Sequence, residues 1–486
     1  MSAYRLLPFR FLRLDEARTL VVNEVGEHHI AANDDFAALV DHRLVPDSGV
    51  YLDLKAKHFL FDGPDRAPFE LLVTKYRTKK AFLDGFTSLH IFVVSLRCEH
   101  SCHYCQVSRV SADRTKYDMS EATAERALDL VFRSPASRLK IEIQGGEPLL
   151  NFERVRQIVA SGRRRAAEEG REVEFVVTTN LVLLDDEMLA FFRDQRVFLS
   201  TSLDGPAAIH DTNRPRPGND SHARVVANLA RAREVLGANS VAALMTTTRL
   251  SLRSPEAIVD EYVRLGFNSI FLRPLSPYGF ATRSVSTTGY AMREFLGFYV
   301  RALERILAVN AEGSFLVETY AQLLLTRMLT PFATGYVDLQ SPAGAGIGAV
   351  VYNYDGDVYA SDESRMLAEM GDMRFRLGNV HRDSYASIFG GETLRTIVAA
   401  SVAESIPGCA DCAFLPWCGA DPVHHYATTG DVVPHIPTSD FHEKNFFIIK
   451  HLLSLYESDP TARRVFWSWI REEPPREETP REQGAA

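Results

Sequence analysis

Apolar and polar residues alternate in blocks along the middle of the chain. Short apolar runs of strand length are each followed by a segment with the apolar spacing of a helix. After the first such run, Ser120 is a suitable N-cap, and Ala124 and Leu128 fall on one face of a helix. The predicted strands cover residues 90–96, 139–144, 174–179, 198–203, 241–247 and 269–273. Repeated strand–helix units predict an α/β fold, a partial (β/α)6 TIM-like barrel with its chemistry at the carboxyl ends of the strands.

The flanks of this region differ in pattern, and they divide the chain into four predicted parts. Residues 1–87 read as strands followed by short helices, a small N-terminal α+β module. Residues 88–330 hold the barrel, and residues 331–455 hold a second group of cysteines. Residues 456–486 end the chain with a helix and a tail, rich in Pro, Glu and Arg from residue 472, that we expect to be disordered.

Composition is that of a large soluble enzyme. The chain has 486 residues, 46% hydrophobic and 24% charged, with a formal charge of -9. It is long enough to bury a sizeable core in two or three domains, and its mild acidity argues against nucleic acid as the main partner. The first residues lack the apolar core of a signal peptide, and no stretch approaches about twenty apolar residues. We therefore expect a cytoplasmic protein that does not bind membranes.

All six cysteines fall into two tight groups, which favours metal ligation over scattered disulfides. The first group, Cys98-x3-Cys102-x2-Cys105, directly follows the first predicted strand. Ferredoxin spacings supply four cysteines to each cluster, and zinc sites usually pair cysteines two residues apart in two knuckles. Three closely spaced thiols fit neither pattern. Inert buried thiols or a disulfide remain the alternative.

This spacing, with Tyr104 just before the last cysteine, resembles the signature of radical S-adenosylmethionine (SAM) enzymes. The resemblance implies that Cys98, Cys102 and Cys105 hold a catalytic 4Fe-4S cluster whose open iron binds SAM. It further implies that SAM is cleaved to a 5'-deoxyadenosyl radical, which abstracts a hydrogen atom from the substrate.

Polar motifs also follow the next three predicted strands. Gly145-Gly146-Glu147-Pro148 comes after the second strand, and we expect its glycines to let backbone approach a ligand closely. By the same resemblance, Glu147 binds the amino group of SAM. Each further motif would alone be typical of a cap or turn, but their position at successive strand ends favours a cofactor site. The resemblance implies SAM contacts from Tyr104, from this motif and from Asn180, with Ser202 and Asp204 facing the ribose and Arg214 the carboxylate.

The second group, Cys409-x2-Cys412-x5-Cys418, resembles the SPASM domain, a C-terminal auxiliary-cluster domain of peptide-modifying radical enzymes. In that family seven cysteines serve two clusters. Here Ser341, Ser361 and Pro422 stand at the positions of three ligands of one cluster, which we therefore expect to be absent.

The other auxiliary cluster needs a fourth ligand beyond the three cysteines, at the position where this chain has His442. Histidine ligates iron in Rieske clusters, so we predict one auxiliary iron-sulfur cluster on Cys409, Cys412 and Cys418, either completed by His442 or left with an open site. A structural Cys3His zinc knuckle is the alternative. The neighbouring pair His424 and His425 are second-choice ligands.

Over residues 4–455 the chain resembles the B-type radical SAM maturase of the His-Xaa-Ser system, with matches such as Gln144-Gly-Gly-Glu-Pro-Leu-Leu-Asn151 and residues 336–344. The resemblance implies modification of a ribosomally made precursor peptide with His-Xaa-Ser repeats. It implies leader-peptide recognition by residues 1–87 and two partners, a second radical SAM maturase and an electron donor such as flavodoxin or ferredoxin. Two alternatives remain: a non-catalytic scaffold that presents the leader peptide, and a radical enzyme for a small molecule.

Overall fold

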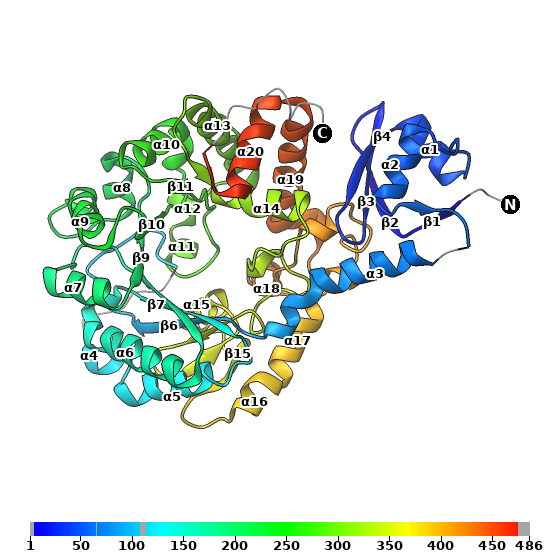
Figure 1. Cartoon of the computed structure of the whole chain (residues 1–486). Helices are drawn as coiled ribbons and strands as arrows, with labels where there is room; N and C mark the ends of the chain where they lie inside the picture. The colour runs from blue at the N-terminus through cyan, green and yellow to red at the C-terminus, as the bar shows by residue number, and fades with distance from the viewer. Residues whose placement is uncertain (1–3, 65, 107–112, 475–486) are drawn as a thin grey trace.

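A computed structural model describes residues 4–64, 66–106 and 113–474 of the chain. It confirms the six predicted strands, which are arranged around an open barrel in Figure 1. They are β6 (Leu89–Ser95), β7 (Arg138–Gly145), β8 (Glu172–Thr178), β9 (Val197–Ser202), β10 (Val241–Leu244) and β11 (Ser269–Ile270). Strands β6 to β10 pair in parallel and in sequence order. Strand β11 pairs instead with β12 (Val317–Glu318), so the barrel is partial, as predicted.

Helices cover the outer face of these strands (Figure 1). Ser120 is the N-cap of the first long one, where its hydroxyl accepts a hydrogen bond from the Thr123 amide at 3.1 Å, as the sequence predicted. Buried Ile141, Phe175 and Leu128 belong to the continuous core between strands and helices. The helices of this region are α4 (Arg114–Tyr117), α5 (Glu121–Val131), α6 (Phe152–Glu169), α7 (Asp186–Asp194), α8 (Ala207–Asn213), α9 (Ser221–Leu236), α10 (Pro255–Arg264), α11 (Phe280–Arg283), α12 (Val285–Thr288), α13 (Met292–Ala311) and α14 (Thr319–Leu329).

The C-terminal region extends the barrel sheet. Strand β13 (Ala349–Tyr352) pairs in parallel with β6 and forms an antiparallel hairpin with β14 (Asp357–Tyr359), which pairs with β15 (Arg376–Asn379). All four residues of β13 are buried, so this strand covers the free edge of β6. The sheet therefore crosses the predicted boundary at residue 330 and fixes the C-terminal region against the strand that precedes the first cysteines. The helices that follow are α15 (Asp362–Glu369), α16 (Tyr385–Gly390), α17 (Glu392–Ala400), α18 (Pro422–Thr429), α19 (Asp440–Ser458) and α20 (Pro460–Arg471).

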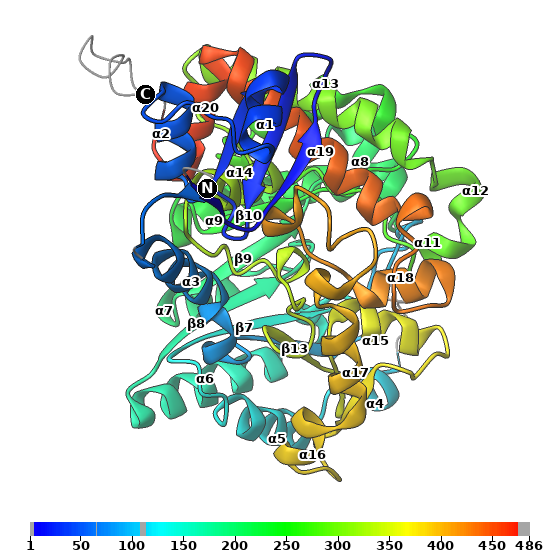
Figure 2. The same ribbon diagram turned by 90° about the vertical axis from the view of Figure 1, so that its right-hand side faces the viewer.

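The N-terminal module stands at one side of the barrel and is joined to it by helix α3 (Ala67–Lys80) (Figures 1 and 2). Its antiparallel sheet has the order β2-β3-β4, and its own core includes Tyr4, Tyr51 and Phe59. The elements of the module that come before α3 are β1 (Arg5–Leu6), β2 (Phe9–Arg13), β3 (Arg18–Asn23), β4 (His28–Ala32), α1 (Asn33–Val40), α2 (Gly49–Ala56) and β5 (Leu60–Phe61).

This module contacts the segment that carries the second cysteines. The Trp417 indole NH donates to the Gly26 carbonyl at 3.2 Å, and the rings of Trp417 and His28 meet edge to face at 5.3 Å. Arg10 donates from Nε to the Ala410 carbonyl at 2.5 Å. The module is therefore anchored on residues next to Cys409 and Cys418.

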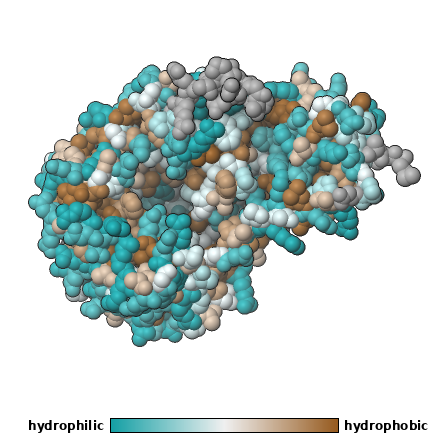
Figure 3. Space-filling view, viewed as in Figure 1, coloured by the Kyte–Doolittle hydropathy of each residue, from teal (hydrophilic) through white to brown (hydrophobic). Residues whose placement is uncertain are grey.

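Hydrophilic residues cover much of the face shown in Figure 3, with hydrophobic residues in scattered patches. Within the described residues, no helix is long and apolar enough to cross a membrane. Most of the predicted disordered tail, residues 475–486, lies outside the described residues.

Candidate functional site

The first three cysteines lie in the loop after β6, at the carboxyl edge of the parallel sheet. All three are half-buried free thiols, so no disulfide joins them. Burial raises the pKa of the Cys98 thiol well above its usual range and that of Cys102 to about 12, and each of these thiols interacts electrostatically with the next cysteine along the loop. Three thiols held together in one loop suit a metal centre, because a bound metal cation offsets the cost of deprotonating them.

Gly145 and Gly146 are required by the packing of this cysteine loop. A Cβ atom on Gly145 would lie 2.2 Å from the Ser95 carbonyl oxygen, and one on Gly146 would lie 2.3 Å from that of Arg97. The amides of Gly146 and Glu147 donate to these same carbonyls, each at 2.7 Å. The structure therefore adds a second reason for the glycines: they let the end of β7 approach the cysteine loop, and their approach to a ligand stays a prediction.

Glu147 is fully buried beside the cysteine loop, and Pro148 follows it as the first residue of a buried turn. Its carboxylate accepts hydrogen bonds from the Leu149 amide at 3.0 Å, the Thr179 hydroxyl at 2.7 Å and the Asn180 amide at 2.8 Å. Burial, with the nearby charge of Glu99, raises the pKa of Glu147 to about 8. A bound ammonium group would offset this penalty, so the site favours a cation at Glu147.

Asp204 and Arg214 form a buried ion pair at the end of β9. Arg214 donates from Nε to the Asp204 carboxylate at 3.1 Å, and the Tyr104 hydroxyl donates to it at 2.6 Å. The Arg214 guanidinium also lies over the Tyr104 ring, 5.2 Å from its centroid. Asp204 therefore orients Arg214 and the aromatic residue of the cysteine loop. Ser202 is half-buried at the last position of β9.

The second group of cysteines forms its own small cavity about the start of α19. Cys409, Cys412, Cys418 and His442 all line this cavity, together with apolar residues such as Phe414. Burial raises the pKa of Cys409 to about 12 and that of Cys418 to about 11, and burial lowers the pKa of His442. A neutral imidazole and three nearby thiols are a donor set that iron-sulfur clusters and zinc both accept. In the described structure, neither His424 nor His425 lines this cavity.

The residues at the three changed SPASM positions have structural contacts. The Ser361 hydroxyl caps α15 by accepting from the Ser364 amide at 3.2 Å. The Ser341 hydroxyl accepts from the Ala403 amide at 2.9 Å, and Pro422 is the first residue of α18.

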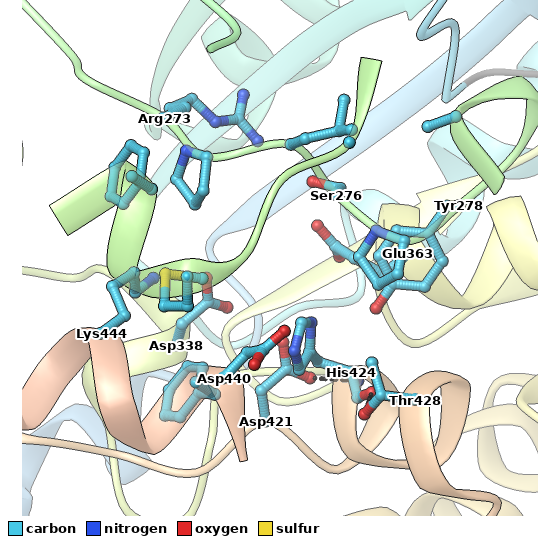
Figure 4. A pocket seen from close by; sticks show the side chains of 18 of the residues that line it. Arg273, Ser276, Tyr278, Asp338, Glu363, Asp421, His424, Thr428, Asp440 and Lys444 are labelled. Carbon is cyan, nitrogen blue, oxygen red and sulfur yellow. Dashed lines mark hydrogen bonds between the residues drawn. The ribbon is translucent and has the colours of Figure 1, made fainter. Parts of the chain in front are cut away.

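A larger cavity of about 380 Å³ has walls that contact both cysteine-bearing segments, although no cysteine is among its lining residues. The segment that contains Tyr278 and Gly279 forms one wall, and a Cβ on Gly279 would lie 2.6 Å from the Cys105 carbonyl oxygen. On the opposite wall, the charge of Lys444 interacts with Cys418. Figure 4 shows the polar side chains that project into this space. The volume is that of a small-molecule site, so the cavity admits a side chain or a short segment of a peptide.

Comparison with protein families decides the nature of the first site. Residues 92–271, which contain the loop of Cys98, Cys102 and Cys105, match the Radical SAM superfamily. This chain contains a radical SAM domain. The observed α/β fold with its open parallel barrel agrees with that assignment.

The relatives of the radical SAM domain include maturating enzymes. The serine-type anaerobic sulfatase-maturating enzyme of Bacteroides thetaiotaomicron is 27% identical over 140 residues, 28% of this chain and 32% of that enzyme. An uncharacterized protein of Methanocaldococcus jannaschii is 29% identical over 133 residues, 27% of this chain and 43% of its own length. The chain thus spans less than half the length of each of these two relatives.

Solved structures of similar fold cover more of the chain. His-tagged anSMEcpe with bound AdoMet has a TM-score of 0.64 at 16% identity, covering 79% of this chain and 98% of that one. Streptococcus suis SuiB bound to S-adenosylmethionine has a TM-score of 0.50 at 14% identity, covering 88% of this chain and 98% of that one. At these identities the likeness establishes the fold.

The residues of the first site fit the group that radical SAM domains use, a 4Fe-4S cluster with SAM. Cys98, Cys102 and Cys105 supply three thiols, which leaves one iron of a cubane without a protein ligand. Glu147 is a fully buried carboxylate, an acceptor of the kind that an ammonium group such as that of SAM needs.

Two charged residues near this site were missed by the sequence analysis. Glu99 accepts from the Asn180 side chain at 2.6 Å, and its charge contributes to the raised pKa of Glu147. Arg365 is fully buried on α15, where its charge interacts with Cys105. Glu99 could have been suspected from its position beside Cys98. No local signal marks Arg365, which lies 260 residues from Cys105 in sequence.

Proposed function

We propose that this chain is a radical SAM maturase that modifies a ribosomally synthesised peptide by hydrogen abstraction. The observation that carries the proposal is the position of the 380 Å³ cavity, one wall of which packs on the backbone of Cys105 and another of which holds Lys444, whose charge interacts with Cys418. A substrate in this cavity would be separated from each group of cysteines by one of these walls. When bound, the cluster and SAM supply a carbon radical that removes a hydrogen atom from a C–H bond.

The protein residues then have three tasks. Cys98, Cys102 and Cys105 hold the cluster and leave one iron open. Glu147 accepts hydrogen bonds from the SAM ammonium, and Arg214, oriented by Asp204, faces the SAM carboxylate. The enclosing walls exclude water and hold the peptide close to the site, which matters because a carbon radical attacks most C–H bonds within reach.

The finer features of the proposal rest on the sequence resemblance. The substrate is a precursor peptide with His-Xaa-Ser repeats, recognised by residues 1–87. The auxiliary centre on Cys409, Cys412, Cys418 and His442 is an iron-sulfur cluster that accepts an electron from the substrate or binds it directly. The partners are a second radical SAM maturase and a cytoplasmic electron donor such as flavodoxin or ferredoxin.

The test combines cofactor cleavage with peptide analysis. Anaerobically reconstituted protein is mixed with dithionite and SAM, and 5'-deoxyadenosine is measured by liquid chromatography. Separately, a His-Xaa-Ser precursor peptide is coexpressed with the protein and analysed by mass spectrometry. We expect cofactor cleavage and a mass change in the peptide.

The matched variants are Cys102→Ala, which should abolish both results, and His103→Ala, which should retain them because that side chain is exposed in the same loop. Iron-loaded protein that never cleaves SAM would favour the scaffold. Cleavage without any change to the peptide would point to a small-molecule substrate.

A further inference from the structure

The cavity between the two cysteine-bearing segments is lined by more negative than positive side chains, and three of the negative ones are half-buried. Four carboxylates line it, and only two permanent cations, Arg273 and Lys444, stand against them. The four carboxylates come from separate segments: Asp338 before β13, Glu363 in the first turn of α15, Asp421 at the N-cap of α18 and Asp440 at the start of α19.

Three of these carboxylates disfavour one another's ionisation. Burial, followed by the charge of Asp421, raises the pKa of Asp338 to about 6. Burial and the charge of Asp338 raise the pKa of Glu363 to about 7, and burial and the charge of Glu363 raise that of Asp421 to about 7. In the described part of the chain none of these three groups takes part in a salt bridge. The native fold therefore holds a repulsion that a cation between them would relieve.

The two cations of the cavity leave part of this charge uncompensated. Lys444 lies beside Asp338, and Arg273 lies on the opposite side of the cavity from Asp421 and His424 (Figure 4). For Glu363, the main influences that raise its pKa are burial and the charges of Asp338 and Asp362. The charge of Lys444 lowers the pKa of Asp421 as well as that of Asp338, so the least compensated carboxylate is Glu363.

Independent of the charges, two buried polar atoms in this cavity lack partners. Tyr278 is 1% exposed, and its hydroxyl has no hydrogen-bond partner among the residues that the structure describes. The Nε2 atom of His424 likewise has none within the described ranges. Both residues line the cavity, and Figure 4 shows them on the same side of it as Glu363. Buried polar groups are normally paired, so unpartnered atoms that face a cavity indicate a ligand with its own donors and acceptors.

The size of the cavity bears on the kind of ligand. Its volume of about 380 Å³ holds a whole side chain, and its carboxylates come from four separate segments. We therefore expect an organic cation between them. Aromatic rings of Phe271, Tyr320 and Tyr336 form an adjoining wall. Arg273 lies over the Phe271 ring at 5.6 Å and Lys444 over the Tyr320 ring at 4.8 Å, so the two cations of the cavity are held on this wall, and Glu363 lies on the other side (Figure 4).

We propose that this cavity binds a cationic side chain of the peptide substrate, an imidazolium, ammonium or guanidinium group, between Glu363 and Asp421. The inference rests on the proposed function, a peptide substrate, and adds which kind of side chain that peptide places in the cavity. A side chain bound there holds the peptide backbone between the two cysteine-bearing segments. The Tyr278 hydroxyl and the His424 imidazole can then form hydrogen bonds with polar atoms of the peptide.

The test measures binding directly and needs no catalysis. The probes are three blocked peptides, acetyl-Gly-Lys-Gly-amide, acetyl-Gly-Leu-Gly-amide and acetyl-Gly-Glu-Gly-amide, titrated into the reconstituted protein in a calorimeter. We expect the lysine peptide to bind at least tenfold more tightly than the other two. Equal binding of the lysine and leucine peptides, or tighter binding of the glutamate peptide, would overturn the proposal.

Variants then locate the effect. Glu363→Gln and Asp421→Asn should each weaken binding of the lysine peptide about tenfold or more, as expected for the loss of one charge-assisted contact. Asparagine keeps the N-cap of α18, where Asp421 accepts from the amides of Val423 and His424. Tyr278→Phe, which removes only the hydroxyl, should weaken binding a few-fold.

The control is Glu369→Gln, which makes the same change on the same helix as Glu363 but outside the cavity lining. If this control weakens binding of the lysine peptide as much as Glu363→Gln does, the effect is one of long-range charge, and the assigned site is refuted. Failure of all cofactor cleavage, with the lysine preference intact, would count against the proposed function alone. Peptide modification without any lysine preference would count against the cation site alone.

Discussion

Replacement of Glu147 by glutamine tests the central contact of the proposed SAM site. The carboxylate is fully buried and accepts three hydrogen bonds, from the Leu149 amide, the Thr179 hydroxyl and the Asn180 amide. Glutamine keeps the shape but carries no negative charge and presents an NH₂ group where one carboxylate oxygen stood. A hydrogen bond to a charged group contributes about 1.5–3 kcal/mol, so the SAM dissociation constant should rise roughly 10- to 150-fold.

The same change has a cost for the fold that the experiment must separate from binding. With an NH₂ group on the Asn180 side, two donors face each other at the position where the Asn180 amide now donates to Oε2 at 2.8 Å. An unsatisfied buried donor costs about 1–3 kcal/mol of unfolding free energy. Iron content and a urea unfolding curve, measured on the same preparation, show whether the variant still holds its cluster.

The assay is equilibrium binding of SAM to anaerobically reconstituted protein at one fixed pH. The matched control is Glu142→Gln, because Glu142 is a half-buried carboxyl on the same strand, β7, and accepts from the Thr178 hydroxyl at 2.8 Å. Glu142→Gln should bind SAM normally. An unchanged SAM dissociation constant in an iron-loaded Glu147→Gln protein would refute the assignment. Weaker SAM binding by Glu99→Gln would then place the ammonium group at Glu99.

Three further predictions concern the cysteine loop, the auxiliary site and the pH dependence of stability. Gly146→Ala should reduce the iron retained after gel filtration, because its Cβ would lie 2.3 Å from the Arg97 carbonyl oxygen, whereas Gly297→Ala, with open space around it, should not. The triple variant Cys98→Ala/Cys102→Ala/Cys105→Ala should retain about four irons per chain, the number in one cubane; zinc in their place would establish a knuckle, and the absence of metal would mean a vestigial site. If iron is found, His442→Cys should keep it and lower the reduction potential, since an anionic thiolate replaces a neutral ligand. Burial raises the pKa of Glu318 to about 7, so its contribution to stability is fully present below the unfolded value of about 4.5 and is lost as pH rises through 7. Between pH 5 and pH 8, the contribution of this group to the free energy of unfolding, measured with urea, should therefore fall by roughly 2–3 kcal/mol. If the unfolding free energy of Glu318→Gln depends on pH as steeply as that of the wild type, the assignment is contradicted.

The sequence alone determined the elements of the barrel and the place of the first proposed metal site. Apolar runs of strand length and helix caps such as Ser120 are local signals, and the structure has strands and a capped helix at the expected positions. The spacing of Cys98, Cys102 and Cys105 holds their thiols within one loop whatever the rest of the chain does. Such features are readable because they depend on neighbours a few residues apart.

The tertiary structure decided what surrounds that loop. Gly145 and Gly146 serve the contact between two strand ends, and no pattern in one sequence distinguishes that use from the approach of a ligand. The pairing of β13 with β6 could not be predicted from the sequence either. The free edge of a sheet can pair with many strands, and this pairing joins residues more than 250 positions apart.

The acidic cavity shows the same limit most clearly. Asp338, Glu363, Asp421 and Asp440 each stand in an ordinary local context, as a turn residue, a helix cap or a first-turn acid. Their raised pKa values and their shared cavity arise only when four distant segments fold together and water is removed, since Coulomb interactions and desolvation depend on distance in space. The sequence thus determined which chemistry the chain brings to its cysteines, and folding alone decided which charges a substrate meets beside them.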